Sequence, residues 1–276
     1  MDGLKLAGPI VAGYDGSPGA DQALAWAMRE AALRDAQLQV VHAIEWPVYV
    51  APGDIGWLSG QERLDIAAKL ASDAKAATGY TGEVSILDGS ATGALCRLSK
   101  SAGMVVTGSR GMGYFSGMLI GSTSASVAVH AECTAIVVRG GKSTPDGPLP
   151  VVVGVDESVY SQRAAEFGFA EASARGCDVV AVRAWRPGPD PLGEIDTAER
   201  HALRIALDPA RKEYPEVKFS LRLVADRPSA ALVEASSEAQ LVALGARGTG
   251  GFKGMLLGSV GHSLLHHAHC PVAVVR

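Results

Sequence analysis

The sequence predicts an α/β protein built from two tandem domains, each a doubly wound, five-stranded parallel sheet with helices on both faces. Short apolar runs rich in β-branched residues alternate with helix-like segments along the chain of 276 residues, as is typical of parallel sheets. The opening segment at residues 9–17 returns at residues 150–158, and a glycine pattern at residues 108–122 returns at residues 245–259. A repeat on this scale indicates a duplicated domain.

The first half opens with an apolar run, residues 9–14, that we expect to form a strand. Ser17 and Pro18 then give an N-cap followed by proline at the first helical position, which predicts a helix reaching about residue 35. The same alternation predicts four more strands and three more helices. The strands are at residues 38–43, 83–87, 104–107 and 135–139, and the helices at residues 59–77, 91–101 and 122–131.

The second half repeats this order after a segment rich in glycine, proline and serine. We expect its strands at residues 151–155, 179–184, 218–224, 241–244 and 272–275, with helices in the gaps. Such composition between two periodic regions is typical of a linker. We therefore place domain 1 at residues 1–140, the linker at residues 141–149 and domain 2 at residues 150–276.

The glycine pattern reads G-x2-G-x9-G-S in both copies and lies between a strand and a helix. Such a turn exposes backbone N–H groups and the positive end of a helix dipole, which together favour an anion such as phosphate. The first copy comprises Gly108, Ser109, Arg110, Gly111, Met112, Gly113, Gly121, Ser122 and Thr123. The second comprises Gly245, Ala246, Arg247, Gly248, Thr249, Gly250, Gly258, Ser259 and Val260. We expect Gly108 and Gly111 to adopt positive φ. The alternative is a tight turn whose glycines serve packing.

An aspartate follows the first strand of each half: Asp15 after Gly13, and Asp156 after Gly154. Doubly wound sheets bind ligands at the carboxyl ends of the strands, where the strand order reverses. Each aspartate would then share one crevice with a glycine loop, and a carboxylate there suits ribose hydroxyls or an adenine edge. The alternative is a turn or helix-capping role, because Asp-Gly-Ser favours turns.

Composition excludes several classes of protein. The net charge is −4 and we see no basic cluster, so we expect no nucleic-acid partner. No apolar run approaches the roughly 18 residues of a membrane span, and the N-terminus lacks the apolar stretch of a signal peptide. The four cysteines form no CxxC pair, which fits a reduced, cytoplasmic protein without membrane attachment.

The segment from Val11 to Ser17, the two glycine loops and the closing His-Ala-x-Cys strands resemble the universal stress protein family, in its tandem two-domain actinobacterial form. The resemblance implies strand order 3-2-1-4-5 in each half and ATP binding, with Mg²⁺ as a candidate companion of the nucleotide. It also implies a regulatory role under stress and a homodimer formed through the last strands. Val41 and Val182, at the ends of the second strands, would meet adenine through their backbone.

The two halves differ at the expected site. Ser122, Thr123 and Ser124 give the first helix start three hydroxyls, whereas the second keeps only Ser259, so we expect the first domain to bind nucleotide more tightly. Glu157 replaces Gly16 and, if it points inward, would repel a nucleotide.

The sequence shows no pattern of a nucleotide-hydrolysing site such as a Walker A lysine. We therefore expect no catalytic residues and at most slow hydrolysis of ATP. His262 and His266 are four residues apart, but no thiolate or carboxylate lies close in sequence, so we expect no metal site. Two alternatives stay open: an ATP-using enzyme, such as an ATPase or an adenylyl- or phosphotransferase, and a nucleotide-free dimeric scaffold.

Overall fold

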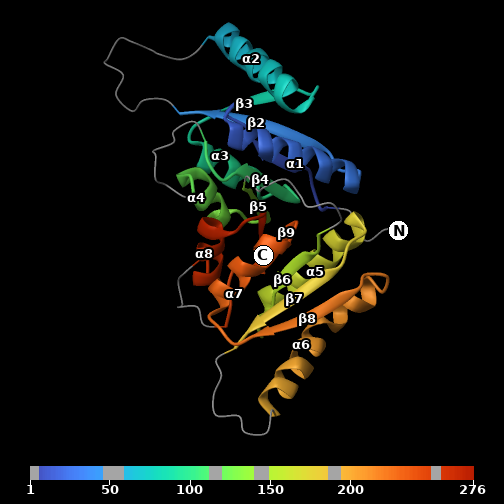
Figure 1. The fold of residues 1–276 in the computed structure, drawn as a ribbon. Helices are drawn as coiled ribbons and strands as arrows, with labels where there is room; N and C mark the ends of the chain where they lie inside the picture. The colour runs from blue at the N-terminus through green and yellow to red at the C-terminus, as the bar shows by residue number, and fades with distance from the viewer. Residues whose placement is uncertain (1–5, 46–58, 112–119, 140–148, 186–193, 250–255) are drawn as a thin grey trace. The chain divides into compact units, whose positions relative to one another are not determined.

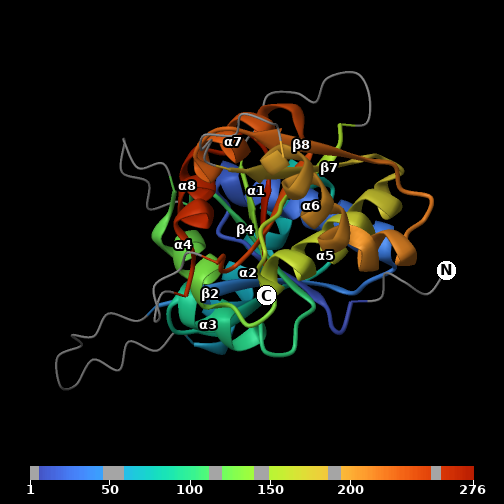
Figure 2. The same cartoon turned by 90° about the horizontal axis from the view of Figure 1, so that it is seen from below.

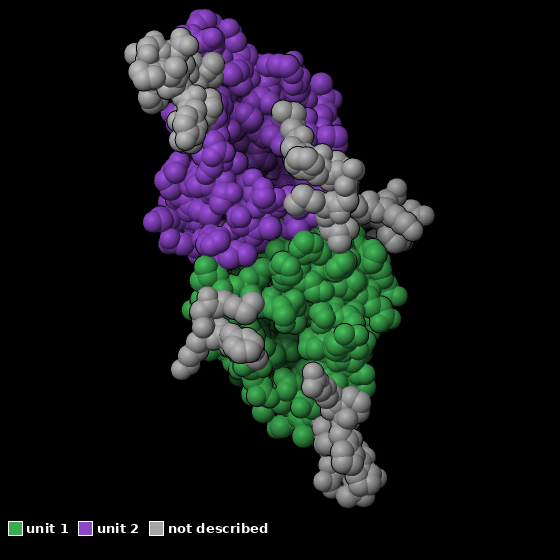
Figure 3. Space-filling view, turned by 90° about the vertical axis from the view of Figure 1, so that its left-hand side faces the viewer, with its two compact units in different colours: residues 1–5, 134–276 green, residues 6–133 purple. Residues whose placement is uncertain are grey.

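The structure is a computed structural model that describes residues 6–45, 59–111, 120–139, 149–185, 194–249 and 256–276. It separates the chain into two compact units, coloured in Figure 3. Unit 2 is residues 6–133 and carries most of the first repeat, while residues 134–276 belong to unit 1. The last strand of the first repeat therefore lies in the unit of the second repeat.

Unit 2 contains a parallel sheet in the order β3-β2-β1-β4. Its elements are β1 (Ile10–Gly13), α1 (Pro18–Arg34), β2 (Leu38–Ile44), α2 (Gly60–Thr78), β3 (Val84–Asp88), α3 (Ala91–Leu98), β4 (Met104–Gly108) and α4 (Ser122–His130). The helix α1 packs on α2, and α3 packs on α4, so the two helix pairs cover the sheet as in a doubly wound fold.

Unit 1 contains the order β8-β7-β6-β9-β10, with β5 beside β10. Its elements are β5 (Thr134–Val138), β6 (Val151–Gly154), α5 (Val159–Arg175), β7 (Val179–Ala184), α6 (Glu194–Glu213), β8 (Phe219–Val224), α7 (Pro228–Ala235), the 3₁₀ turn η1 (Ser236–Glu238), β9 (Leu241–Gly245), α8 (Ser259–His267) and β10 (Val272–Val275). This confirms the expected order 3-2-1-4-5 for the second repeat.

The helices of unit 1 lie on both faces of its sheet. In Figure 1 and in the turned view of Figure 2, α5 and α6 lie on one side of the strands and α7 and α8 on the other. The central strands β6 and β9 are buried along their length except at the final glycine of each. Both faces of these strands are therefore covered, and the carboxyl ends of the strands are the place where a ligand can reach the sheet.

Local capping fixes where the first helix of each repeat begins. The Ser17 hydroxyl accepts a hydrogen bond from the Ala20 amide at 3.2 Å, with Pro18 in the first turn of α1. Ser158 does the same for the Ser161 amide at 3.1 Å at the start of α5. These caps satisfy amides that a helix start leaves unpaired. They confirm the predicted start signal and hold the residues just before each helix, including the two aspartates, in a defined turn.

The strand β10 is hydrogen-bonded on both edges. It pairs in parallel with β9 and antiparallel with β5, with Ala273 opposite Ile136. These two residues occupy equivalent positions of the two repeats. The pairing of last strands that the family resemblance implies between two molecules is therefore formed within one chain, and β10 offers no open edge to a second copy.

Candidate functional site

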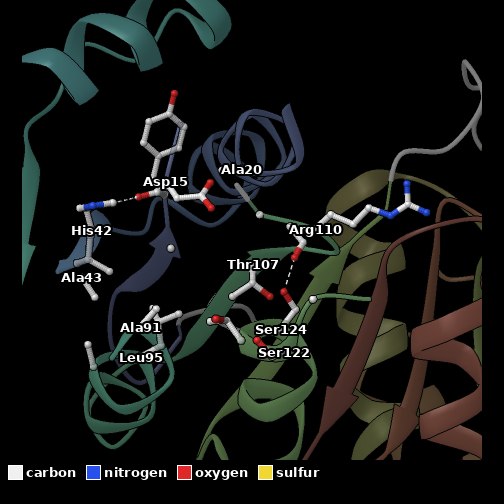
Figure 4. A pocket seen from close by; sticks show the side chains of 18 of the residues that line it. Asp15, Ala20, His42, Ala43, Ala91, Leu95, Thr107, Arg110, Ser122 and Ser124 are labelled. Atoms are coloured by element: carbon white, nitrogen blue, oxygen red, sulfur yellow. Dashed lines mark hydrogen bonds between the residues drawn. The ribbon is translucent and has the colours of Figure 1, made fainter. Parts of the chain in front are cut away.

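A cavity of about 440 Å³ lies at the carboxyl ends of β1, β2 and β4 in unit 2 (Figure 4). It is lined by Gly13, Tyr14, Asp15, Ala20, Val41, His42, Ala43, Ala91, Ala94, Leu95, Thr107, Gly108, Arg110, Gly111, Ile120, Gly121, Ser122, Thr123 and Ser124. This is the crevice predicted from the strand ends, and its size lies within the common range for small-molecule sites, roughly 300–1,000 Å³.

Asp15 joins the turn after β1 to the glycine loop. Its Oδ1 accepts a hydrogen bond from the Ser17 amide at 3.0 Å. Its Oδ2 faces Gly111 so closely that a Cβ atom on that glycine would stand 2.5 Å away. The turn role that we kept as the alternative for Asp15 is therefore real, but the same carboxylate also lines the cavity.

The glycines of the loop serve close packing rather than positive φ. Among the glycines that the structure describes, positive φ occurs at residues 16, 79, 89 and 176, so the expectation for Gly108 and Gly111 was wrong. A Cβ atom on Gly108 would stand 2.4 Å from the Gly19 carbonyl oxygen at the start of α1. The Ser17 hydroxyl also donates to the Arg110 carbonyl at 3.4 Å. The loop is thus held directly on the first turn of α1, where only glycine fits.

The N-terminus of α4 opens into the cavity behind this loop. Gly121 is its N-cap, with no side-chain capping bond, and its amide donates to the Ser109 carbonyl at 2.7 Å. The Ser124 hydroxyl donates to the Gly108 carbonyl. We expected three hydroxyls for a ligand, but Ser124 is buried and its hydroxyl holds the loop. The hydroxyls of Ser122 and Thr123 remain at the helix start.

The opposite end of the cavity lies over β2 and α3. Val41 was expected at the end of β2, but it is the fourth of the seven residues of that strand, and its carbonyl accepts from the Tyr14 amide at 2.9 Å. The backbone of Val41 is engaged by the sheet, so the expectation that it is open to adenine was wrong. Alternate residues of a strand direct their backbone groups to the same neighbouring strand. Val41 and Ala43 therefore both direct theirs to the side of β1, and Ala43 is the first such residue beyond the end of β1.

His42 and Thr107 are lining residues that the sequence did not single out. His42 Nδ1 lies 2.8 Å from the Tyr14 carbonyl oxygen, drawn as a dashed line in Figure 4. The Thr107 hydroxyl is buried and has no hydrogen-bond partner within the described residues. No local motif marks either residue. Both belong to apolar strands, and only the fold shows which of their side chains line the cavity.

Unit 1 contains the equivalent cavity, of about 640 Å³. It is lined by Gly154, Val155, Asp156, Glu157, Ser161, Val182, Arg183, Ala184, Pro228, Leu232, Leu244, Gly245, Arg247, Gly248, Thr249, Gly258, Ser259, Val260 and Gly261. Asp156 accepts hydrogen bonds from the Ser158 and Thr249 amides, both at 2.9 Å. A Cβ atom on Gly248 would stand 2.6 Å from Asp156 Oδ2. The aspartate–glycine contact is therefore present in both units.

The model of the universal stress protein family matches residues 7–139 and again residues 149–276. The chain belongs to the universal stress protein family. It is 37% identical over 285 residues to a universal stress protein of Mycobacterium tuberculosis strain H37Rv, covering 97% of this chain and 96% of that protein. A universal stress protein of Mycolicibacterium smegmatis is also 37% identical, over 289 residues, with the same coverage.

A solved universal stress protein from Archaeoglobus fulgidus matches the fold with a TM-score of 0.73, covering 98% of both chains at 18% sequence identity. This chain therefore shares its α/β architecture in two tandem domains with that solved member of the family. Within the described residues of this family member, no helix is long and apolar enough to cross a membrane.

Most of the predicted site residues of this universal stress protein line one of the two cavities. Ser109 and Ala246 do not, since they are buried and their carbonyls accept from the Gly121 and Gly258 amides. Three predicted residues, Met112, Gly113 and Gly250, lie outside the described residues. The exposed Arg110 side chain extends away from the other labelled residues in Figure 4.

The two sites of this universal stress protein differ most at one charged cluster. We expected Glu157 to repel a nucleotide if it points inward, and the structure shows its carboxylate accepting a hydrogen bond from Arg183 Nη2 at 2.8 Å. Arg183 Nε donates to Glu199 on α6. Burial lowers the pKa of Arg183, but its hydrogen bonds to Glu199 and Glu157 outweigh the burial and raise the pKa overall. In unit 2, His42 stands at the position of Arg183 and Gly16 at that of Glu157.

Proposed function

We propose that this chain is a regulatory stress-response protein that binds one ATP in each repeat and hydrolyses it slowly or not at all. The observation that carries the proposal is the contact of Asp15 with Gly111, repeated by Asp156 with Gly248. In both cases a carboxylate and a glycine loop form one wall of a cavity at the carboxyl ends of parallel strands. A nucleotide is a ligand that needs both, because its sugar offers hydroxyl donors and its phosphates need N–H donors.

The residues present fit such a ligand. The uncapped start of α4 directs amide groups and the positive helix end to one side of the unit 2 cavity, where Ser122 and Thr123 add hydroxyls. The start of α8, with Gly258 as N-cap and Ser259 behind it, provides the same in unit 1. Phosphates would bind there, with Mg²⁺ as their proposed companion, and Asp15 and Asp156 would accept hydrogen bonds from the adenosine end.

The groups in the unit 2 cavity support binding more than turnover. Tyr14 donates its hydroxyl to Asp21 at 2.8 Å, and burial together with this hydrogen bond raises its pKa far above neutral, so Tyr14 does not serve as a base. His42 is engaged by the Tyr14 carbonyl through Nδ1. A general base must reach the proton that it removes. His42 lies over β2, at the end of the cavity away from the glycine loop, whereas Asp15 contacts that loop, so hydrolysis at phosphates bound there would depend on Asp15.

The proposal is tested on the full-length protein. Nucleotide extracted from the purified chain is identified by mass spectrometry, and calorimetry on stripped protein measures ATP binding with and without Mg²⁺. We expect about two sites per chain, with phosphate release far slower than nucleotide exchange. The variant with Asp15→Ala and Asp156→Ala is the matched control for binding through the two cavities. Stripped protein that binds no ATP would show that the proposal is wrong, and fast turnover would favour the enzyme alternative.

We also propose how the protein assembles and where it is located. We keep a homodimer as a proposal, but β10 has both edges paired, so a second copy would use a surface other than this strand. We also propose a cytoplasmic location. None of the four cysteines forms a disulfide, which agrees with a reducing compartment. Size-exclusion chromatography with light scattering tests the dimer.

A further inference from the structure

The two cavities present opposite hydrogen-bonding groups at the end far from the glycine loop. The strand order places β2 and β4 on either side of β1, and β7 and β9 on either side of β6. A ligand with its phosphates at the glycine loop after β4 or β9 therefore places its other end, the base of a nucleotide, over β2 or β7. His42 occupies that end in unit 2, and Arg183 occupies it in unit 1.

His42 offers an acceptor. Its Nδ1 lies 2.8 Å from the Tyr14 carbonyl oxygen, and a carbonyl oxygen can only accept, so Nδ1 carries the hydrogen. In this tautomer Nε2 is an acceptor. An acceptor suits the exocyclic amine of a 6-aminopurine such as adenine.

Arg183 offers only donors. Its Nε donates to Glu199 and its Nη2 to Glu157, which holds the guanidinium plane in one orientation. The side chain is only 12% exposed, and Nη1 is the nitrogen that these two bonds leave for a ligand. Guanidinium donors recognise the O6 and N7 acceptors of guanine, whereas the amine of adenine at the same position is itself a donor.

We propose that the position occupied by His42 and Arg183 sets base selectivity, and that the unit 1 cavity favours 6-oxopurine nucleotides relative to the unit 2 cavity. Glu157 and Glu199 act as positioning residues for Arg183. The inference rests on the proposed function, since it assigns a ligand class to the same two cavities. It makes the two repeats two different nucleotide sites in one chain.

Single-site proteins separate the two cavities without cutting the chain. Gly111→Val forces the Asp15 carboxylate away and closes the unit 2 site, and Gly248→Val does the same to Asp156 in unit 1. Competition calorimetry with ATP, GTP and inosine triphosphate then gives the affinity ratio of each site. We expect the GTP-to-ATP affinity ratio of the unit 1 site to exceed that of the unit 2 site by roughly fivefold or more, the size of one hydrogen bond from a charged donor. Inosine triphosphate, which carries O6 without the 2-amino group, should behave like GTP.

Replacing Glu157 and Arg183 of unit 1 with the equivalent residues of unit 2 provides the decisive variant. In the Gly111→Val protein, Glu157→Gly with Arg183→His recreates the Gly16 and His42 pair and should lower the ratio to that of unit 2. Arg183→Lys keeps the charge between the two glutamates but loses the planar fork, and should lower the ratio partly even if the double change unfolds. Arg222→His, which breaks an exposed pair with Glu238 outside the cavity, is the control and should change nothing.

The outcomes distinguish this inference from the function on which it rests. Equal ratios in the two single-site proteins, or a ratio that neither the double change nor Arg183→Lys alters, would overturn the base selectivity and leave nucleotide binding in place. Failure of the unaltered chain to bind any of the three nucleotides would overturn both.

Discussion

The carboxylate of Asp15 lies against Gly111 so closely that a Cβ atom on the glycine would stand 2.5 Å from Oδ2. Asp156 and Gly248 repeat the contact at 2.6 Å. Even a methyl group at this glycine would therefore displace a carboxylate from another segment, about ninety residues away in the sequence. This couples the two walls of each cavity and makes the glycine a sensitive probe of the site.

Gly111→Ala should weaken ATP binding in unit 2 while leaving the fold nearly intact, because the added methyl group displaces the end of one short side chain. Gly248→Ala should do the same in unit 1, and the protein carrying both changes should lose both sites. Gly60→Ala is the control, since a Cβ atom there meets nothing within 4 Å. Calorimetry measures affinity and stoichiometry. Wild-type binding by the double variant would mean that the loops are packing devices only.

Asp15→Ala should lower the ATP affinity of unit 2 by roughly 1–3 kcal/mol if the carboxylate accepts hydrogen bonds from the adenosine end. Asp15→Asn separates this effect from the turn, because an amide oxygen can still accept from the Ser17 amide, which lies 3.0 Å from Oδ1. We expect Asn to preserve the thermal stability and to recover part of the affinity. Identical losses for Ala and Asn without any loss of stability would assign the effect to charge rather than to the hydrogen bond.

Ser122→Ala and Ser124→Ala should have different effects. The buried Ser124 hydroxyl donates to the Gly108 carbonyl, so its removal should cost about 0.5–1.5 kcal/mol of unfolding free energy. Ser122 is exposed at the start of α4 and lines the cavity, so its removal should reduce ATP affinity with little change in stability. Urea unfolding and calorimetry on the same two proteins test this, and the opposite pattern would contradict the assignment.

Thr123 and Val260 carry the remaining difference between the helix starts of the two units. We still expect unit 2 to bind ATP more tightly, but by one hydroxyl rather than two, which corresponds to about 0.5–1.5 kcal/mol. Thr123→Val should remove this hydroxyl's share of the difference in ATP affinity, and Val260→Thr should reduce the difference from the other side. Both exchanges keep the side-chain shape nearly constant. Tighter binding in unit 1 of the unaltered chain would reverse the ranking.

Thr107→Val removes a buried hydroxyl that has no partner within the described residues. Leu244 at the equivalent place in unit 1 shows that an apolar side chain suits this position. An unsatisfied buried polar group costs about 1–3 kcal/mol, so the ligand-free variant should be more stable than the unaltered protein. Thermal unfolding without nucleotide measures the gain, and a loss of stability would reveal a hydrogen bond that Thr107 makes in solution.

The fold was predictable because its signals are local and occur twice. Ser17 and Ser158 cap the first helices where the sequence places them, and the strands end within about two residues of the expected positions. The loops and aspartates that line the cavities were found for the same reason. A pattern repeated at fixed spacing is strong information about where a chain turns.

The features that the sequence could not reveal are contacts between segments that lie far apart in the chain. Glu157 was expected to repel a nucleotide if it points inward. Its pairing with Arg183, 26 residues away, could not be recognised before β6 and β7 are placed side by side. Val41 was wrongly predicted to end β2, because the number of residues by which β2 extends beyond β1 is set by strand pairing and not by composition. The loop glycines were assigned to positive φ, whereas Gly108 is constrained by the backbone at the start of α1 and Gly111 by the Asp15 carboxylate. Neither neighbour is visible in the sequence near the loop.

The antiparallel contact of β5 with β10 has a consequence for assembly. Ile136 and Ala273 face each other at equivalent positions of the two repeats, while Val137 faces Val272 and Ala135 faces Val274. The two strands therefore meet across a local two-fold axis, as two copies of a symmetric dimer would. Joining the partners in one polypeptide makes this contact independent of dilution, since a tether supplies an effective concentration of about millimolar. It also guarantees that this contact always joins one copy of each repeat and never two identical repeats.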